Sequence, residues 1–173
     1  MPKYGSKTVN YNTYHKRNGK MRLLGDTTSV QLPSLEFQSD SMKGSGIMGD
    51  IDMPSASPGG MTVSISLRVD GEEAAALGAP TLQELEIRWV TDRIDSTGMK
   101  LGIDAHKAII KGYTKKFDPG KVEPGAAQDA SVDIEVVYYK KVLNGNTIVE
   151  VDKLNGVLMV GGTDHYKQVK DNL

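Results

Sequence analysis

Only a few groups of residues in this sequence have types and spacings that could support chemistry. The segment Gly44-Ser45-Gly46-Ile47-Met48-Gly49 matches the GxGxxG pattern of dinucleotide-binding loops. Such a loop must open a helix whose N-terminus meets the phosphates. Here Asp50-Ile51-Asp52-Met53-Pro54 follows, which cannot open a helix and would repel phosphate. The glycines are therefore expected to permit a tight backbone path, and no cofactor is predicted.

Metal ligands and catalytic groups are equally sparse. Asp50 and Asp52 have the spacing of two calcium ligands, but the remainder of a calcium loop, including its closing glutamate, is missing from the sequence. His15, His106 and His165 are far apart and form no HxH or HxxxH pair. The sequence contains no Walker loop, nucleophile elbow or paired catalytic acids. We therefore predict neither an enzyme nor a metal site.

Length and composition indicate one domain that has little core for its size. We expect a single domain over residues 1–173. Hydrophobic residues make up 38% of the chain and aromatic residues 6%, while glycine occurs 19 times. These values predict many turns and a fold that gains part of its stability from neighbouring copies. The sequence has no cysteine, which excludes disulfides and thiolate metal sites.

The N-terminal sequence, the apolar runs and the net charge limit where the chain is expected to be made and what it is expected to bind. The N-terminal residues contain no apolar signal-peptide core, and no apolar run approaches the roughly 20 residues that span a bilayer. We therefore expect synthesis in the cytoplasm and no membrane insertion by the monomer. The net charge of −1, from 21 basic and 22 acidic residues, does not favour a dedicated nucleic-acid binder.

Basic residues are concentrated at the N-terminus, where no acidic residue precedes Asp26. The first ten or so residues look irregular, which predicts an N-terminal arm over about residues 1–20. This arm is either solvated or in contact with an acidic surface of a neighbouring subunit. Candidate contact residues at the two ends of the chain are Lys3, Lys7, Lys16, Arg17, Asp164 and Leu173.

Alternating apolar residues predict a mainly β fold of about seven strands. The expected strands cover residues 21–24, 28–37, 61–69, 82–91, 99–113, 132–140 and 147–152. Residues 82–91 also show helical spacing, but a turn at 95–98 followed by renewed alternation favours a hairpin. Short helices are expected at residues 72–77 and at about 164–170. The fold class is thus a β-sandwich or partly closed barrel with one or two short helices.

Residues 38–60 are expected to form a long irregular loop rich in Ser, Gly, Pro and Met. The loop carries apolar residues every few positions, which a solvated loop does not need. Methionines on a flexible segment suit an adaptable contact with another chain. We therefore predict an inter-subunit loop, with candidate contact residues Met42, Gly44, Gly46, Ile47, Met48, Ile51 and Met53.

Several blocks, in order along the chain, resemble the major tail tube proteins of contractile-tailed phages and of R-type, pyocin-like tailocins. The first blocks are Leu24-Gly25 with residues 30–35, and the glycine-rich residues 43–49. The strongest blocks lie in the C-terminal half, at residues 110–112, 117–120, 137–140, 144–145, 149–152, 155–157, 161–164 and 172–173. Residues 70–107 match by pattern only, and the chain departs from the usual family pattern at residues 161–164 and at Asn172.

This resemblance implies a β-sandwich or partly closed barrel with a flanking helix. Hexameric rings would stack into a hollow tube inside a sheath, and each subunit would lend strands to a continuous barrel. The implied partners are further copies of the chain, the tail sheath protein, the tape-measure protein, and baseplate and tail-terminator proteins. DNA would pass only as cargo in a phage. The implied location is a virion tail or tailocin particle assembled in the host bacterial cytoplasm.

The channel of such a tube should be lined by polar side chains that do not hold phosphate. Strand alternation defines two faces without identifying the one that lines the channel. Our candidates for lumen-facing residues are Glu84, Glu86, Lys100, Asp104, Asp133 and Glu135. Two alternatives remain open: a tube protein of another contractile injection or secretion system, and a monomeric β-sandwich binding module.

Overall fold

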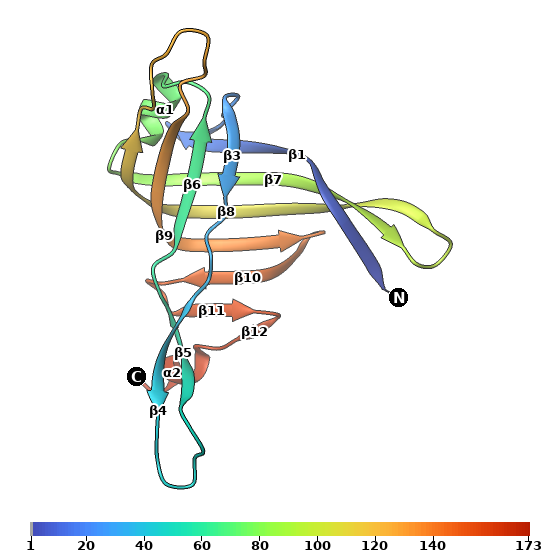
Figure 1. Ribbon diagram of the computed structural model, residues 1–173, viewed down its shortest axis with the longest axis vertical. Helices are drawn as coiled ribbons and strands as arrows, with labels where there is room; N and C mark the ends of the chain where they lie inside the picture. Colours follow the sequence, from blue (N-terminus) through green and yellow to red (C-terminus); the bar gives the residue numbers. More distant parts are fainter. Residues whose placement is uncertain (1) are drawn as a thin grey trace.

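Twelve strands and two short helices make up the computed structural model, which describes residues 2–173 (Figure 1). Ten strands form one sheet and the other two form a separate hairpin, so the expected mainly β fold with short helices is confirmed. The strands are β1 (Lys3–Arg17), β2 (Lys20–Leu23), β3 (Thr27–Gln31), β4 (Phe37–Met42), β5 (Ile51–Pro58), β6 (Thr62–Leu67), β7 (Leu82–Asp95), β8 (Lys100–Asp118), β9 (Ala130–Leu143), β10 (Asn146–Asp152), β11 (Val157–Val160) and β12 (Thr163–Asp164). The helices are α1 (Glu72–Leu77) and α2 (Lys167–Asp171).

The large sheet folds over itself because β9 changes its partner midway. Residues 130–135 of β9 pair with β6, whereas residues 138–143 pair with β10. The neighbouring strand β8 follows the same bend, with a register shift between Lys111 and Gly112. Strands that pass from one layer to the other through such irregularities form the corners of crossed sandwiches.

Two layers result, and their strands cross in Figure 1. The short layer consists of β3, β6, the first half of β9 and the end of β8. The long layer consists of β2, β1, β7, β8, the second half of β9, β10, β11 and β12, in that order. β8 and β9 belong to both layers.

The core lies between the two layers and is built by strand alternation. In the short layer, Val30, Ile65 and Val132 are paired across three strands and point inward. In the long layer, the inward row includes Leu85, Ile110, Tyr139, Val151 and Leu158, all buried. Burying each large aliphatic side chain of this kind contributes about 1.5–3 kcal/mol to stability.

Helix α1 forms over the residues that the sequence predicts, and it closes one end of the sandwich (Figure 1). Glu72 and Glu73 lie in its first turn, where acidic groups are favoured by the helix dipole, and Gly78 follows its last residue. Leu77 is fully buried in the core. Buried Gln83, near the start of β7, links the segment after α1 to β1. Its Oε1 lies 2.7 Å from His15 Nε2, and its Nε2 donates to the Ala79 carbonyl oxygen at 3.1 Å.

Residues 38–60 are not irregular, and this expectation was wrong. They contain most of the β4–β5 hairpin, whose register pairs Met42 with Ile51 and Asp40 with Met53. The Ser55 hydroxyl also donates to the Gln38 carbonyl oxygen at 3.0 Å. The strands arise from pairing with each other rather than from local propensity, because Ser, Asp and Pro are poor strand formers. The glycine-rich segment forms the turn, where Gly46 and Gly49 have φ values of +85° and +88°, so the expected tight backbone path is confirmed.

The expectation of an irregular N-terminus was also wrong. β1 begins at Lys3 because β7 is long enough to pair with it, through the register Tyr4 with Ile94 and Tyr11 with Trp89. The expected strand at 28–37 is divided instead between β3, which ends at Gln31, and β4, which begins at Phe37. Pro33 lies in the connection and cannot donate to a ladder. The two helices of residues 2–173 are six and five residues long and too short to cross a membrane.

Candidate assembly surfaces

The outward side of the short layer carries small polar side chains, and we call it the serine face. Three cross-strand rows form it: Ser29, Ser66 and Ser131; Gln31, Ser64 and Asp133; and Thr62 with Glu135. The Ser64 hydroxyl donates to Asp133 Oδ1 at 2.6 Å. Alternation positions this face because the intervening residues Val63, Ile65, Val132 and Ile134 are buried in the core.

Glu135 is the most strongly compensated acid of the serine face. Its carboxylate lies 3.1 Å from Lys115 Nζ and 3.8 Å from Lys153 Nζ. Burial raises the pKa of Glu135, but the hydrogen bond and charge of Lys115 and the charge of Lys153 outweigh it, so the net pKa is lowered. Glu135 therefore remains ionised at neutral pH with two lysines beside it, and its charge is locally balanced.

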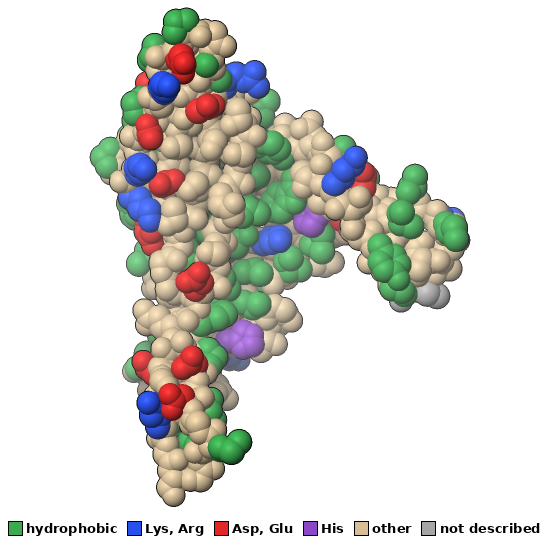
Figure 2. Space-filling model, viewed as in Figure 1, with side chains coloured by type: hydrophobic (Ala, Val, Ile, Leu, Met, Phe, Trp, Pro, Cys, Tyr) green, Lys and Arg blue, Asp and Glu red, His purple; other side chains and the backbone are tan. Residues whose placement is uncertain are grey.

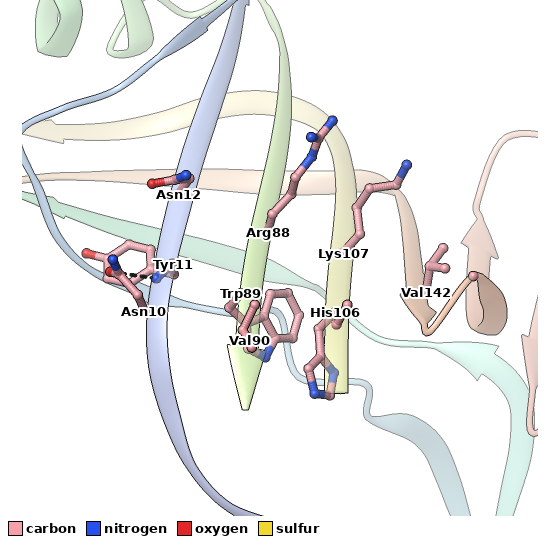
Figure 3. A pocket seen from close by; sticks show the side chains of 11 residues that line it. Asn10, Tyr11, Asn12, Arg88, Trp89, Val90, His106, Lys107 and Val142 are labelled. Atoms are coloured by element: carbon pink, nitrogen blue, oxygen red, sulfur yellow. Dashed lines mark hydrogen bonds between the residues drawn. The ribbon is translucent and has the colours of Figure 1, made fainter. Parts of the chain in front are cut away.

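The outward side of the long layer is densely charged, and we call it the charged face. Glu84 pairs with Lys16 at 3.1 Å, and Glu86 pairs with Arg88 at 2.5 Å. The same side of the strands also carries Lys107, Lys111, Tyr138, Lys140, Glu150 and Asp152. An open concavity of about 570 Å³ lies between β1 and β9, and Arg88 and Lys107 project together beside it (Figure 3).

Tyr138 and Glu150 form a partly buried polar contact on the charged face. The Tyr138 hydroxyl donates to Glu150 Oε1 at 3.1 Å, and Lys111 Nζ lies 5.6 Å from the ring centre. Desolvation raises the pKa of Tyr138, and the neighbouring carboxylate of Glu150 raises it further, to about 12. The phenol therefore stays neutral at any physiological pH and acts as a hydrogen-bond donor.

The ends of β1, β7 and β8 extend beyond the body as a three-stranded projection, which we call the tongue (residues 3–10 and 91–104; Figure 1). One side of it is apolar. Tyr4, Ile94 and Leu101 lie directly opposite one another across the three strands, and their exposed fractions are 62%, 43% and 83%. Large apolar side chains gathered in one exposed patch indicate a contact surface.

The opposite side of the tongue is polar and includes two of the lumen candidates, Lys100 and Asp104. Asp104 pairs with Arg93 and accepts a hydrogen bond from Asn144 Nδ2 at 2.8 Å. The hydrogen bonds from Asn144 and Arg93 lower the pKa of Asp104. Asp104 thus fastens the base of the tongue to the turn after β9.

The lumen candidates therefore do not share one surface. Glu84 and Glu86 lie on the charged face, Asp133 and Glu135 on the serine face, and Lys100 and Asp104 on the polar side of the tongue. Because the charged and serine faces are the two outward sides of one sandwich, only one of them can look into a channel. Sequence alternation separated the two sides of each strand but did not show the layer to which a strand belongs. Lys100 and Asp104 share the side of β8 that carries His106 and buried Ala108, which is the inward side of the long layer.

The candidate contact residues at the chain ends divide into two kinds. Lys16 and Arg17 pair within the subunit, with Glu84 at 3.1 Å and Glu73 at 3.6 Å. Asp164 accepts the backbone N–H of Tyr166 at 3.0 Å. Lys3 and Lys7 lie on the exposed tongue strand, and Leu173 is almost fully exposed. Lys3 also acts on Asp104 through its charge, whereas Lys7 and Leu173 are exposed and could meet a neighbour.

The inter-subunit loop candidates gather on the β4–β5 hairpin, which extends from the body in Figure 1. Met42, Ile51 and Met53 share one side of it with Asp40, as their register and alternation require. Gly44, Gly46, Ile47 and Met48 lie in the turn between the strands. Lys43 and Asp50 close the base of the turn at 3.3 Å.

A partly covered apolar surface lies on the inward side of the long layer, beyond the reach of the short layer, and we call it the hollow. Trp89 and His106 stack there with ring centres 5.0 Å apart, and Lys141 Nζ lies 5.7 Å from the Trp89 ring. Half-buried Val149 and Val160 continue the surface. Figure 2 shows apolar side chains gathered between the tongue and the lower body, with histidine and basic side chains among them.

The sequence analysis did not identify the hollow. Trp89 alternates in phase with buried Leu85 and Ile87, which places it on the inward side. The sequence therefore indicated the inward position of Trp89. It could not show that Trp89 lies near Lys141, because that proximity depends on the pairing of β7, β8 and β9. Burial lowers the pKa of His106, and the charge of Lys141 lowers it further. In residues 2–173, no three His, Asp or Glu side chains gather closely enough to hold a metal ion.

Comparisons with known proteins identify the family of this chain and a solved structure with a similar fold. The chain is 24% identical over 157 residues to the tail tube protein of Escherichia phage P2, covering 86% of this chain and 87% of that protein. Its fold is similar to that of the sheath/tube terminator of the extracellular contractile injection system PVC, with a TM-score of 0.53 and 7% sequence identity. The match covers 80% of this chain and 97% of the terminator chain. The family model of phage tail tube protein FII matches residues 7–173. This chain therefore belongs to the FII family of phage tail tube proteins.

Proposed function

We propose that this chain is the building block of the inner tube of a contractile tail or tailocin. Hexameric rings stack into a hollow tube inside a sheath, with the tape-measure protein, or DNA in a phage, as passing cargo. Family membership over residues 7–173 supports this structural, non-enzymatic role. The subunit is made and assembled in the host bacterial cytoplasm and ends in the tail particle.

The observation that carries the proposal is the pair of open edges on the short layer. In the part of the chain that the structure describes, residues 2–173, β3 pairs only with β6, and beyond Tyr113 the end of β8 pairs only with β9. These edges lie on opposite sides of the same layer. Joining β3 of one subunit to the end of β8 in the next gives a head-to-tail contact, which closes into a ring when the rotation between subunits allows it. A closed ring also removes edges that would otherwise promote aggregation.

The same argument selects the layer that lines the channel. The outer edges of the long layer are the four-residue β2 and the two-residue β12. Edge strands this short offer few backbone groups for pairing with the next subunit, so they are poorly suited to continue a barrel from one subunit to the next. The short layer presents the serine face, whose acids Asp133 and Glu135 are held by Ser64 and Lys115. Small side chains with locally balanced charges give a passing polymer few groups to bind. We therefore propose that Asp133 and Glu135 face the channel.

The charged face would then look outward, away from the tube axis. Its alternating acids and bases, including the Lys16–Glu84 and Arg88–Glu86 pairs, offer a surface for the sheath. Charged surfaces of this kind favour specificity and rapid docking over strong binding, which suits a tube that must move relative to its sheath. Contacts with baseplate and tail-terminator proteins would occur at the two ends of the tube.

Electron microscopy of the concentrated protein, combined with mass measurement of the assembled form, tests this proposal. We expect rings or tubes with a central channel. A monomeric β-sandwich binding module would give featureless single particles at every concentration, including in the presence of preformed baseplate, and this result would overturn the proposal. Tubes alone do not separate a phage tail from another contractile injection system, but capsid genes beside this gene would identify a phage.

A further inference from the structure

The base of the β4–β5 hairpin packs on the core of its own subunit through Ala56, but residues 51–55 of β5 and every side chain of β4 are exposed. Within residues 2–173, β4 and β5 form strand pairs only with each other. Its apolar side carries Met42, Ile51 and Met53, with exposed fractions of 41%, 45% and 51%. An isolated two-stranded hairpin is marginally stable in water at best. The hairpin is therefore expected to be completed by a second surface.

The hollow has an apolar surface and a basic side chain, which complement the apolar side and the acidic residues of the hairpin. Trp89, Val149 and Val160 supply an apolar floor that the short layer leaves partly open. Lys141 supplies a cation within that floor, over the Trp89 ring. Within residues 2–173, neither Lys141 nor Asp40 belongs to any of the ion pairs of the subunit. Lys141 is half-buried and already lies over the Trp89 ring, so an acidic side chain that docks beside it would form an ion pair partly shielded from water.

The charge of the hairpin complements that of the hollow. Residues 40–53 contain three acids, Asp40, Asp50 and Asp52, against the single base Lys43. Asp40 is the acid that shares the apolar side with Met42, Ile51 and Met53. In the hollow, Lys141 lies opposite Val149 on the neighbouring strand. Each surface thus combines apolar residues with one unpaired charge, and the two charges are of opposite sign.

We propose that the hollow receives the β4–β5 hairpin of a second copy of this chain, with Met53 packed on Val149 and Asp40 beside Lys141. The inference rests on the proposed tube and names the surface that joins its subunits. The tip of the hairpin, which carries Met42, Ile51 and Met53, runs away from the body of its own subunit (Figure 1), so the donor is another copy. The methionines adapt to the floor because their side chains are flexible and polarisable.

Charge exchange tests the contact. Asp40→Lys and Lys141→Asp should each reduce the yield of assembled tubes by about tenfold or more, because each places like charges together. The double variant Asp40→Lys/Lys141→Asp should recover most of the yield. Asp52→Lys is the matched control, since Asp52 lies on the other side of the same hairpin. Tubes that form normally from both single variants, or a double variant as poor as the singles, would overturn the contact.

A disulfide trap tests the geometry directly, because the chain contains no cysteine. Tubes of Met53→Cys/Val149→Cys should give a ladder of covalent oligomers on mild oxidation, whereas each single-cysteine variant should not. A cross-link within one monomer would show the hairpin folding onto its own subunit and would overturn the proposal. If wild-type protein forms tubes but this variant gives no cross-link, only the contact fails; if wild-type protein never assembles, the tube itself fails.

Discussion

Gly112 and the backbone of Glu135 approach so closely that no side chain fits between them. A Cβ atom at position 112 would lie 2.0 Å from the Glu135 carbonyl oxygen. This contact occurs at the register shift where β8 and β9 pass from the long layer to the short layer. A glycine at this position therefore permits the bend on which the two-layer fold depends.

Replacing Gly112 should weaken the whole fold. Gly112→Ala forces β8 and β9 apart at the bend, and we expect the free energy of unfolding to fall by about 3 kcal/mol, at the upper end of overpacking effects. Urea unfolding followed by circular dichroism measures the change. Gly25→Ala is the control, since no atom lies within 4 Å of a Cβ at that position. Equal stability of the two variants would show that the bend does not need glycine.

Asp104 should make the base of the tongue sensitive to acid. The hydrogen bonds from Asn144 and Arg93 lower its folded-state pKa below the ordinary value of an aspartate side chain. A lowered folded-state pKa contributes stability above the unfolded pKa, and this contribution is lost as the pH falls through the folded pKa. At about pH 7, backbone amide hydrogen exchange in residues 91–104 should therefore be slower in the wild-type protein than in the Asp104→Asn variant. The difference should shrink below about pH 4, and a constant difference would contradict this linkage.

The apolar side of the tongue should be needed for assembly but not for folding. Ile94 lies between Tyr4 and Leu101 in the exposed apolar row. Ile94→Asp should leave the circular dichroism spectrum unchanged and reduce the tube yield by about tenfold, because burying an unpaired carboxylate is costly. Sedimentation measures the yield. Lys100→Asp, on the opposite side of the tongue, should assemble normally, and equal loss in both variants would refute the apolar contact.

The two outward faces should differ in their access to large reagents. In assembled tubes without sheath, Ser66→Cys should lie in the channel and Lys107→Cys on the outer surface. A maleimide attached to a polymer too bulky to enter the channel should modify Lys107→Cys rapidly and Ser66→Cys slowly. A small maleimide should modify both. The reverse order for the bulky reagent would assign the channel to the charged face.

The sequence predicts the elements whose local pattern agrees with their final environment. Residues 61–69 alternate cleanly, and residues 132–140 are rich in β-branched and aromatic residues. Both segments contain a strand with one side in the core. The ambiguous segment 82–91 is confirmed as strand, within the longer β7. Helix α1 follows from its acidic first turn and the glycine after its end. Each of these segments buries its own apolar residues, so local pattern and tertiary packing agree.

The strands that the sequence does not predict depend on pairing with a neighbouring strand, which their own residue pattern does not reveal. About seven strands were expected, and residues 2–173 contain twelve. β1, β4 and β5 were missed because they lack a buried face over much of their length, and β11 and β12 because they are only four and two residues long. Lys3, Gly5 and Ser39 become strand residues only because another strand lies beside them. The division of Glu84 and Asp133 between two outward faces follows from the bend at Gly112, which no periodicity reveals.

The central claim is that the short layer lines the channel and closes the ring through its two edges. A cryo-electron microscopy reconstruction of the assembled protein tests it most directly. We predict that β3 of each subunit lies about 4.8 Å from the end of β8 in the next, as in a hydrogen-bonded sheet, with Asp133 facing the axis. A reconstruction in which Glu84 and Glu86 face the axis, or in which these two edges do not meet, would contradict the account.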